Sequence, residues 1–296
     1  MQKVGLIVGK FYPLHQGHLN MILSAKLSVE TLHIFVCSET KRDYQLFQES
    51  AFTKPPSNKD RIQWAELALA DIPGIHIHDF NEDGIPSYPN GWEAWSHRLK
   101  ETLLQKEIHP SIIFSSEPQD KDFYEVHFNT PVRLVDPPRD DFPVSATKIR
   151  TTPFQYWTFI PTMIRPFFTK HIFIDEAIPY GPTLIPSLTK LFNAVEIPHF
   201  EKIILIPVSS SHLSALIESY NINNRSISAI IGNDHFITHF NEKMKTYQDN
   251  TLTENRKTRI LELPSKHEHL SSMSQIDYFK QITSFIYHQL KEPAIN

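Results

Sequence analysis

Cysteine is almost absent from this chain, and long apolar runs are missing altogether. The single cysteine, Cys37, excludes an internal disulfide framework and any four-cysteine zinc site. No apolar stretch approaches the roughly 20 residues that a membrane-spanning helix needs, and Met1 leads directly into a strand-like run without a signal peptide. These absences predict a cytoplasmic protein that has no membrane partner.

Neither sign of charge dominates the sequence. Lys and Arg number 29 against 33 Asp and Glu, which gives a formal net charge of −4. A broad surface for nucleic acid requires clustered positive charge, so no nucleic-acid partner is expected. Any anionic ligand must therefore be held by a local site. The 296 residues, 40% of them hydrophobic, suffice for one large domain or two ordinary ones.

Strand-like apolar runs alternate with helical patterns through the first half. The runs are 3–9, 31–38, 75–80, 111–116 and 132–136. Between them, apolar residues recur at helical spacing over 19–27, 58–72 and 91–106. Alternating strands and helices predict an α/β fold whose parallel sheet is covered on both faces. Such sheets bind ligands at the carboxyl ends of their strands.

Glycine is also scarce, with 8 residues against 22 prolines. A segment rich in proline and aromatic residues interrupts the alternating pattern over 151–170. Beyond it a second set of apolar runs begins, and 275–290 carries the apolar stripe of a C-terminal helix. The sequence therefore predicts a first domain over 1–150, a connector over 151–170 and a smaller α/β domain over 171–296.

Two histidines three residues apart follow the first predicted strand, in the segment "GKFYPLHQGH". A zinc site needs three or four ligands, and the neighbouring sequence offers no Cys or carboxylate at ligand spacing, so no metal site is predicted at His15 and His18. The pair lies where a helix begins, and free backbone N–H groups and the helix dipole favour an anion there. Gly17 lets the backbone approach a ligand closely. The favoured interpretation is a phosphate site in which imidazoles donate to phosphate oxygens.

A second candidate for anion binding is the segment "VSATKIR", which follows the fifth strand-like run. Ser145 is placed as an N-cap, and the next helical turns bring a hydroxyl and two cations from Thr147, Lys148 and Arg150. Taken alone, the segment also fits an ordinary capped helix with solvated basic residues. Its combination with the histidine pair favours a joint phosphate site.

Together these two motifs resemble the signatures of the nucleotidyltransferase superfamily, an (H/T)xGH motif and a distal S-x-T-x-x-R. The segments "EDGIPSYPNGW", "FSSEPQDK" and "SATKIRTTPFQYWTFIP", with "RPFFTK" further on, are similar to the NadR-type family. That family contains bifunctional nicotinamide-mononucleotide adenylyltransferase and ribosylnicotinamide kinase proteins. The resemblance is dense from Val4 to Lys170 and thin beyond. It implies a Rossmann-like nucleotidyltransferase domain followed by a P-loop-kinase-like α/β domain.

The resemblance implies that ATP reacts with nicotinamide mononucleotide (NMN) to give NAD and pyrophosphate, with Mg²⁺ as cofactor. The catalytic residues would be His15, His18, Lys10 and Arg150, with His18 nearest the α-phosphate. The ATP-binding residues would be Gly9, Phe11, Gly17, Ser115, Ser116, Glu117, Ser145 and Thr147. The NMN-binding residues would be Arg61, Asn90, Trp92 and Trp95. Either tryptophan could stack on the nicotinamide ring or simply pack a loop onto the domain.

The second half departs from the family pattern. A P-loop needs G-x-x-x-x-G-K-[ST], in which glycines form an anion nest and the lysine contacts the β- and γ-phosphates. Glu176 stands at the first glycine and Pro182 at the lysine, so that only Gly181 and Thr183 remain. Further on, "GN" stands at 232–233, where the family's second metal-binding strand has an aspartate. We expect a degenerate kinase domain without kinase activity that supports structure or assembly into a homo-oligomer.

Two other functions compete with NAD synthesis. One is adenylyl or cytidylyl transfer to another phosphate, which the "IPSYPNGW" and "SSEPQDK" segments disfavour. The other is a non-catalytic sensor or regulator. The chain starts at its first strand without a helix-turn-helix, so direct repression of genes is not expected. The retained His15, His18, Ser145 and Arg150 favour an enzyme. NMN is the expected substrate, with its nicotinate counterpart poorer.

Overall fold

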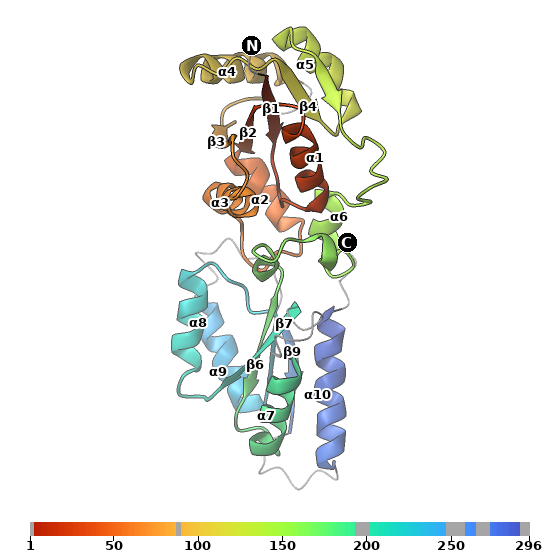
Figure 1. The fold of residues 1–296 in the computed structure, drawn as a ribbon. Helices are drawn as coiled ribbons and strands as arrows, with labels where there is room; N and C mark the ends of the chain where they lie inside the picture. The colour runs from red at the N-terminus through yellow and green to blue at the C-terminus, as the bar shows by residue number, and fades with distance from the viewer. Residues whose placement is uncertain (1–2, 87–89, 193–201, 247–257, 265–272, 291–296) are drawn as a thin grey trace. The chain divides into compact units, whose positions relative to one another are not determined.

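The computed structural model describes residues 3–86, 90–192, 202–246, 258–264 and 273–290, and the chain divides into two compact units (Figure 1). The first unit comprises Met1–Ser50 and Pro56–Ile164, and the second comprises Ala51–Pro55 and Arg165–Asn296. The first unit thus ends inside the predicted connector. The short segment Ala51–Pro55 belongs to the second unit although it lies early in the sequence.

The first unit contains a five-stranded parallel sheet in the order β3-β2-β1-β4-β5. Its strands are β1 (Val4–Gly9), β2 (Thr31–Ser38), β3 (Ile75–Asn81), β4 (Ile112–Ser115) and β5 (Val132–Leu134). Its helices are α1 (Gln16–Lys26), α2 (Thr40–Gln48), α3 (Asn58–Leu69), α4 (Trp92–Gln105), α5 (Lys121–Phe128) and α6 (Ala146–Thr151). The predicted α/β fold with parallel strands is therefore confirmed.

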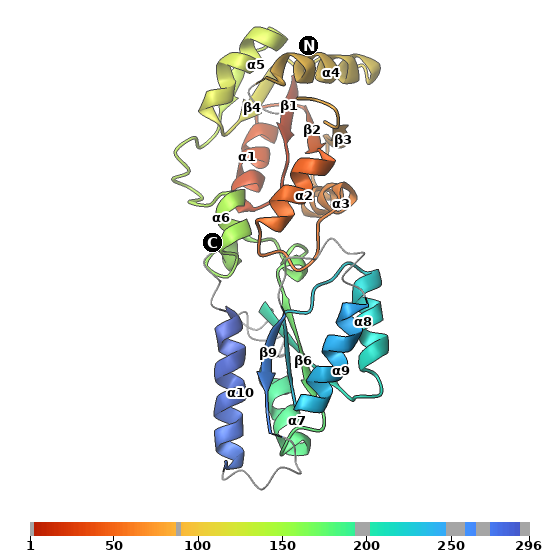
Figure 2. The same cartoon turned by 180° about the vertical axis from the view of Figure 1, so that it is seen from behind.

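Helices cover both faces of this sheet (Figure 2). α4 and α5 pack on one face, where alternate strand residues meet helix residues in a buried cluster made of Leu6, Phe35, Cys37, Phe80, Trp95, Leu99, Leu103, Ile108, Ile113 and Tyr124. α1 and α3 contact β1, β2 and β3 through their own buried residues. Because both faces of the sheet are covered, the central strands β1 and β2 read as nearly continuous apolar runs in the sequence.

The second unit contains a four-stranded parallel sheet in the order β7-β6-β8-β9. Its strands are β6 (Lys170–Asp175), β7 (Ile203–Val208), β8 (Ala229–Gly232) and β9 (Arg259–Glu262). Its helices are α7 (Gly181–Phe192), α8 (Leu213–Ile222), α9 (Asp234–Lys245) and α10 (Gln275–Leu290). The bounds of α10 coincide with the predicted C-terminal helix.

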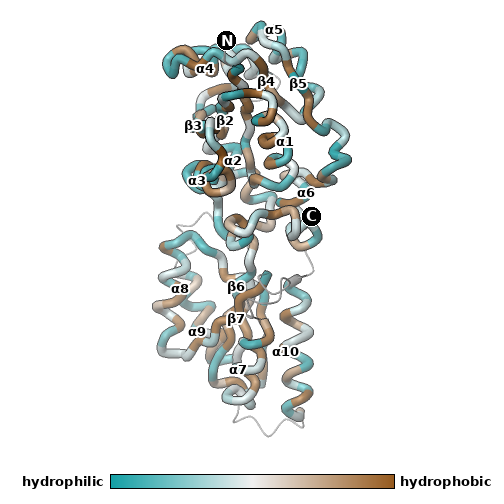
Figure 3. The backbone as a smooth tube through the Cα atoms, in the orientation of Figure 1, coloured by the Kyte–Doolittle hydropathy of each residue, from teal (hydrophilic) through white to brown (hydrophobic). Residues whose placement is uncertain are grey.

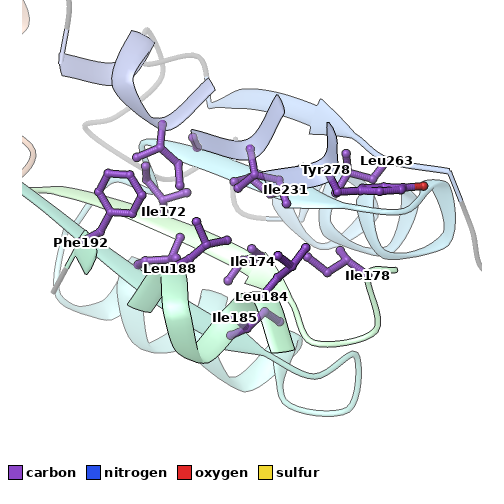
Figure 4. Close-up of a cluster of buried hydrophobic side chains, with 14 of the residues drawn as sticks. Ile172, Ile174, Ile178, Leu184, Ile185, Leu188, Phe192, Ile231, Leu263 and Tyr278 are labelled. Atoms are coloured by element: carbon purple, nitrogen blue, oxygen red, sulfur yellow. The ribbon is translucent and has the colours of Figure 1, made fainter. Parts of the chain in front are cut away.

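Two hydrophobic clusters hold the second sheet between its helices. α7 and α10 contribute to the cluster drawn in Figure 4, which includes Ile172, Ile174, Leu184, Leu188, Ile231, Tyr278 and Ile282. α8 and α9 contribute to the cluster of Phe173, Val208, Leu213, Ile217, Ile227, Ile230, Phe236 and Phe240. The tube in Figure 3 is accordingly brown, that is hydrophobic, along β6. Within the described ranges, every helix is too short or too polar to span a lipid bilayer.

Candidate active site

Two cavities lie at the carboxyl edge of the first sheet. The first has a volume of about 510 Å³ and the second about 340 Å³. The segment after β1 lines both, because Gly9 and Lys10 border the first cavity while His15 and His18 border the second. The segment after β4 does the same, with Asp120 in the first cavity and residues 116–117 in the second. The two cavities are therefore neighbours built on shared loops.

The histidine pair begins helix α1 at the second cavity. His15 is the N-cap, and its Nδ1 accepts a hydrogen bond from the backbone N–H of His18 at 3.3 Å. The two imidazoles stack with centroids 3.7 Å apart, and Phe11 packs its ring edge-on against His18 at 5.1 Å. A Cβ on Gly17 would lie only 3.2 Å from the His15 ring, so this turn favours glycine.

Both imidazoles are uncharged near neutral pH. Burial, and then the charge of Arg139, lower the pKa of His18 to about 3. Burial, followed by the neighbouring His18, lowers the pKa of His15 well below its usual value. Because Nδ1 of His15 accepts a hydrogen bond, its proton sits on Nε2. That Nε2 is buried and has no hydrogen-bond partner among the described residues. It is therefore a buried N–H donor that has no acceptor among these residues.

Arg139 contributes a cation to the second cavity, whose lining also includes the carboxylates of Glu117 and Asp136. It lies in the loop after β5, and its Nη2 donates to Oε1 of Glu117 at 2.6 Å. The sequence prediction did not include it. The one available signal was its position after a strand of a parallel sheet, where ligands bind. Five predicted ATP-site residues also line this cavity: Gly17, Ser116, Glu117, Ser145 and Thr147.

Other predicted phosphate-site residues support this cavity from outside its lining. Arg150 donates through Nη1 to the carbonyl oxygen of Tyr12 at 2.6 Å and through Nη2 to Oγ1 of Thr147 at 3.0 Å. It therefore joins α6 to the turn after β1. Burial lowers the pKa of its guanidinium. Ser115 accepts from the backbone N–H of Glu117 at 3.0 Å and so shapes the loop after β4.

Aromatic side chains form one wall of the first cavity. Trp92, Trp95 and Tyr124 all line it. Trp92 packs against the ring of Phe123 with centroids 3.8 Å apart. Trp95 donates through Nε1 to Oε1 of Glu82 at 2.7 Å, which fixes the orientation of its indole. The structure thus places both predicted tryptophans at the cavity.

The loop before α4 borders the same cavity through Gly91. A Cβ on Gly91 would lie 1.8 Å from the carbonyl oxygen of Pro86, so only glycine fits there. The preceding residue, Asn90, is exposed and is not one of the lining residues. Residues 87–89 of the "IPSYPNGW" segment lie outside the described residues.

Charged groups also line the first cavity. Lys10 lies between two carboxylates, with its Nζ 3.3 Å from Oδ1 of Asp43 and 3.1 Å from Oε2 of Glu82. Glu39 and Asp120 add two more carboxylates to the lining, and Arg42 adds one more cation. Because Lys10 is already paired, this cavity is acidic on balance. Sequence reasoning missed Glu82 and Asp43, which are far from Lys10 in the chain.

Arg61 lies beneath the first cavity and does not line it. Its side chain is fully buried and donates from Nη1 to the carbonyl oxygens of Lys10 at 2.8 Å and Cys37 at 2.7 Å. Its Nη2 donates to Oδ2 of Asp43 at 2.6 Å, and its guanidinium packs over the ring of Tyr12. The buried cation therefore joins the ends of β1 and β2 to helix α2.

The segment that the sequence predicts to be a degenerate P-loop forms a tight loop between β6 and α7. Its backbone N–H groups donate within the chain: Glu176 to the Val208 carbonyl, Ala177 to Oδ1 of Asp175, Ile178 to the Asp175 carbonyl and Gly181 to the Ile178 carbonyl. Pro182 has no N–H to offer. The Thr183 hydroxyl donates to the Tyr180 carbonyl and accepts from Gln275. These groups are therefore engaged internally.

The residues 232–233, which stand where the family's second metal-binding strand has an aspartate, lie at the end of β8. Asn233 caps α9, because its Oδ1 accepts from the backbone N–H of Phe236 at 2.9 Å, and its Nδ2 donates to Oδ2 of Asp175 at 3.1 Å. A Cβ on Gly232 would lie 2.6 Å from the Phe236 ring. In the described parts of both units, no group of three or more His, Cys, Asp or Glu side chains is spaced to hold a metal ion.

Comparison with known proteins decides the family of the first unit. Residues 6–152 match the cytidylyltransferase-like family. The first unit belongs to that family. The cytidylyltransferase-like domain therefore contains all of the residues that line the two cavities described above, and the predicted Rossmann-like nucleotidyltransferase fold is confirmed.

The predicted resemblance to the NadR-type family is confirmed as well. The chain is 39% identical over 191 residues to the trifunctional NAD biosynthesis/regulator protein NadR of Escherichia coli (strain K12), covering 64% of this chain and 47% of that protein. The NadR of Salmonella typhimurium is 39% identical over 193 residues, covering 65% and 47%. The chain spans about half the length of these curated relatives.

Solved structures extend the similarity of fold beyond the cytidylyltransferase-like domain. A crystal structure of a NadR protein in complex with NR has a TM-score of 0.66 and 17% identity, covering 98% of this chain and 96% of that one. A second, in complex with NAD and AMP-PNP, has a TM-score of 0.63 with the same identity and coverage. Both units therefore follow the fold of a NadR protein.

Proposed function

We propose that this chain transfers the adenylyl group of ATP to NMN and releases NAD and pyrophosphate. One observation carries the proposal: two neighbouring cavities at one sheet edge match the two substrates in chemistry. The second cavity combines the helix N-terminus, the His15 and His18 imidazoles and Arg139. These groups suit a triphosphate, because helix-terminal N–H groups and cations stabilise negative charge.

The first cavity suits the nicotinamide end of NMN. The pyridinium ring of NMN is a flat aromatic cation, and such rings bind well to aromatic faces and to carboxylates. Trp92, Trp95 and Tyr124 provide the aromatic wall, and Glu82 and Asp120 provide negative charge. A nicotinate ring would bring an extra carboxylate next to these acids. The cavity therefore favours the amide over the acid.

The chemistry requires no covalent intermediate with the protein. An oxygen of the NMN phosphate attacks the α-phosphorus of ATP, a new P–O bond forms, and the bond to the β-phosphate breaks to release pyrophosphate. Catalysis then consists of positioning two polyanions and stabilising the charge that develops. We assign His15 and His18 as neutral donors to the reacting phosphates and Arg139 as the cation beside them. Arg150 acts by holding the turn after β1 in place.

Lys10 has a different assignment in this proposal. Its ammonium lies in the first cavity, between Asp43 and Glu82. We therefore assign it to the phosphate of NMN. Mg²⁺ would enter with ATP, because this ion is commonly held by substrate phosphates and one or two carboxylates. Asp136 and Glu117 line the second cavity, and Glu117 is paired with Arg139, so Asp136 is the candidate carboxylate.

We propose further that the second unit does not phosphorylate nicotinamide riboside. A P-loop directs its backbone N–H groups at the phosphates, whereas the loop after β6 uses those groups for hydrogen bonds within the chain. Pro182 supplies neither the N–H nor the ammonium of the missing lysine. Glu176 would add a carboxylate where phosphate must approach.

The test is an assay of purified protein with ATP, Mg²⁺ and either NMN or nicotinate mononucleotide. We expect NAD from NMN and much less product from the nicotinate substrate. Glu82→Gln should narrow that preference, because it removes negative charge beside the ring and keeps an acceptor for Trp95. Glu117→Gln, in the other cavity, is the matched control and should leave the preference unchanged. Equal use of both substrates by the wild type would contradict the substrate assignment, and no product from either would contradict the activity.

A further inference from the structure

Arg42 is a cation of the first cavity that has no acidic partner. It lies in the first turn of α2 and lines the cavity. Its backbone N–H donates to Oε2 of Glu39 at 2.8 Å, which fixes the backbone of this turn. The residue is exposed, and no carboxylate of the described residues forms an ion pair with its guanidinium. That guanidinium is therefore available to an anionic ligand.

Two other cations near this cavity are already held by carboxylates. Lys10 lies between Asp43 and Glu82, and the buried Arg61 donates to the same Asp43. The two cations and the two carboxylates balance each other in charge. Lys10 can still donate a hydrogen bond to a phosphate, but this group of four adds no net positive charge. Among the described residues that line the cavity, Arg42 is thus the one cation left unpaired.

The charge of Arg42 acts on Arg150, which supports the second cavity. Burial is the main cause of the lowered pKa of Arg150, and the charge of Arg42 adds to it, while Tyr12 and Glu49 act in the opposite direction. Arg150 in turn donates to Oγ1 of Thr147, which lines the second cavity. Arg42 therefore lies near both the first cavity and α6. Adenylyl transfer requires the reacting atoms of the two ligands within about 3–3.5 Å of each other, so their phosphates must meet where the two cavities adjoin.

We propose that Arg42 binds the phosphate of NMN and so makes the first cavity selective for the mononucleotide over its riboside, which lacks that phosphate. The inference rests on the proposed function in naming NMN as the occupant of this cavity. A guanidinium can donate two parallel hydrogen bonds to a phosphate and remains charged at any physiological pH. Arg42 then acts by position, because it holds the attacking phosphate and exchanges no proton.

The experiment compares two ligands that differ only in this phosphate. NMN and nicotinamide riboside are each titrated into the full chain, and binding is followed by tryptophan fluorescence. The four tryptophans of the chain all lie in the first unit, and Trp92 and Trp95 line the cavity. The signal therefore reports on the first unit and does not depend on catalysis.

Three variants separate the role of Arg42 from a general effect of charge. Arg42→Gln removes the charge and keeps a good helix former, and we expect it to raise Kd for NMN about tenfold or more while Kd for the riboside stays unchanged. Arg42→Lys keeps the charge but loses the paired donors, so its rise should be smaller. Lys41→Gln is the matched control, because Lys41 is exposed on the same helix and lines neither cavity. It should change neither Kd.

Steady-state assays complete the test. KM for NMN should rise in Arg42→Gln, and KM for ATP should not. An equal rise in Kd for NMN and for the riboside, an equal effect of Lys41→Gln, or a wild type that binds no NMN would overturn the inference. Unchanged NMN affinity in Arg42→Gln, with NAD still formed, refutes this inference alone. If NMN binding depends on Arg42 but the wild type makes no dinucleotide, the proposed activity fails and the role of Arg42 stands.

Discussion

Replacing His18 tests whether a neutral imidazole stabilises the reacting phosphates. Burial and Arg139 lower the pKa of His18 to about 3, so the ring is uncharged at pH 7. Removing one preorganised donor typically costs about 10²–10³-fold in kcat. We expect His18→Ala to lower kcat for NAD formation by that factor in steady-state assays. His18→Asn keeps an N–H donor and should retain more activity.

The same lowered pKa makes folding stability depend on pH. The unfolded chain titrates His18 near its usual pKa of 6.5 and the folded chain near 3, so the unfolded state binds more protons between these values. This contribution to stability is therefore complete above about pH 6.5 and is lost as the pH falls toward 3. When the pH falls from 7.5 to 5.5, one such histidine lowers the free energy of unfolding by about 1.4 kcal/mol.

Urea unfolding at pH 7.5 and 5.5 measures this contribution. Other histidines with lowered pKa values act in both proteins, and burial, the larger cause of the lowered pKa of His15, persists when His18 is removed, so the comparison of wild type with His18→Ala reports mainly on His18. We expect the loss of unfolding free energy on acidification to be about 1.4 kcal/mol smaller in the variant. Equal losses in both proteins, or an unchanged kcat, would refute the reasoning. Stoichiometric zinc that disappears in the variant would indicate a metal site instead.

Three further predictions follow from the two units. Trp92→Leu removes an aromatic face from the first cavity and should raise KM for NMN about tenfold without changing KM for ATP, as steady-state kinetics would show. Arg61→Met leaves Asp43 without its buried partner and should lower the free energy of unfolding by about 3–5 kcal/mol in urea. Thr183→Ala should leave NAD formation unchanged, and neither this variant nor the wild type should phosphorylate nicotinamide riboside in a product assay. If the wild type phosphorylates the riboside and Thr183→Ala abolishes that activity, the proposal that the second unit is not a kinase is wrong.

The sequence was enough to predict the α/β architecture and the place of the turn that carries His15 and His18. Both depend on local patterns: strands buried on two faces read as apolar runs, and a helix that begins directly after a strand places His15 and His18 at the sheet edge. The resemblance to the NadR-type family rested on contiguous motifs. Contiguous motifs can be recognised from the sequence alone, because they do not depend on which distant residues come together in the fold.

Pairings between distant segments were decided only by the tertiary structure. Arg139 pairs with Glu117, and Glu82 binds both Lys10 and Trp95. No periodicity in the sequence predicts such contacts. Arg61 is a cation of the kind that binds anionic ligands, yet its guanidinium is buried, where Nη1 donates to the carbonyl oxygens of Lys10 and Cys37 and Nη2 donates to Asp43. The type of a residue determines which groups its side chain can bind, but it does not determine the direction in which the side chain points.

The segment Ala51–Pro55 shows the same limit at the level of whole segments. Residues 51–55 are flanked on both sides by helices of the first unit, and a reading along the chain assigns them to that unit. Their partners are Phe167, Phe168 and Ser226, which lie more than 100 residues further on. Burial of one phenylalanine and the hydrogen bonds of Thr53 decide the assignment, because buried apolar area and satisfied backbone groups depend on proximity in space and not on order in the chain.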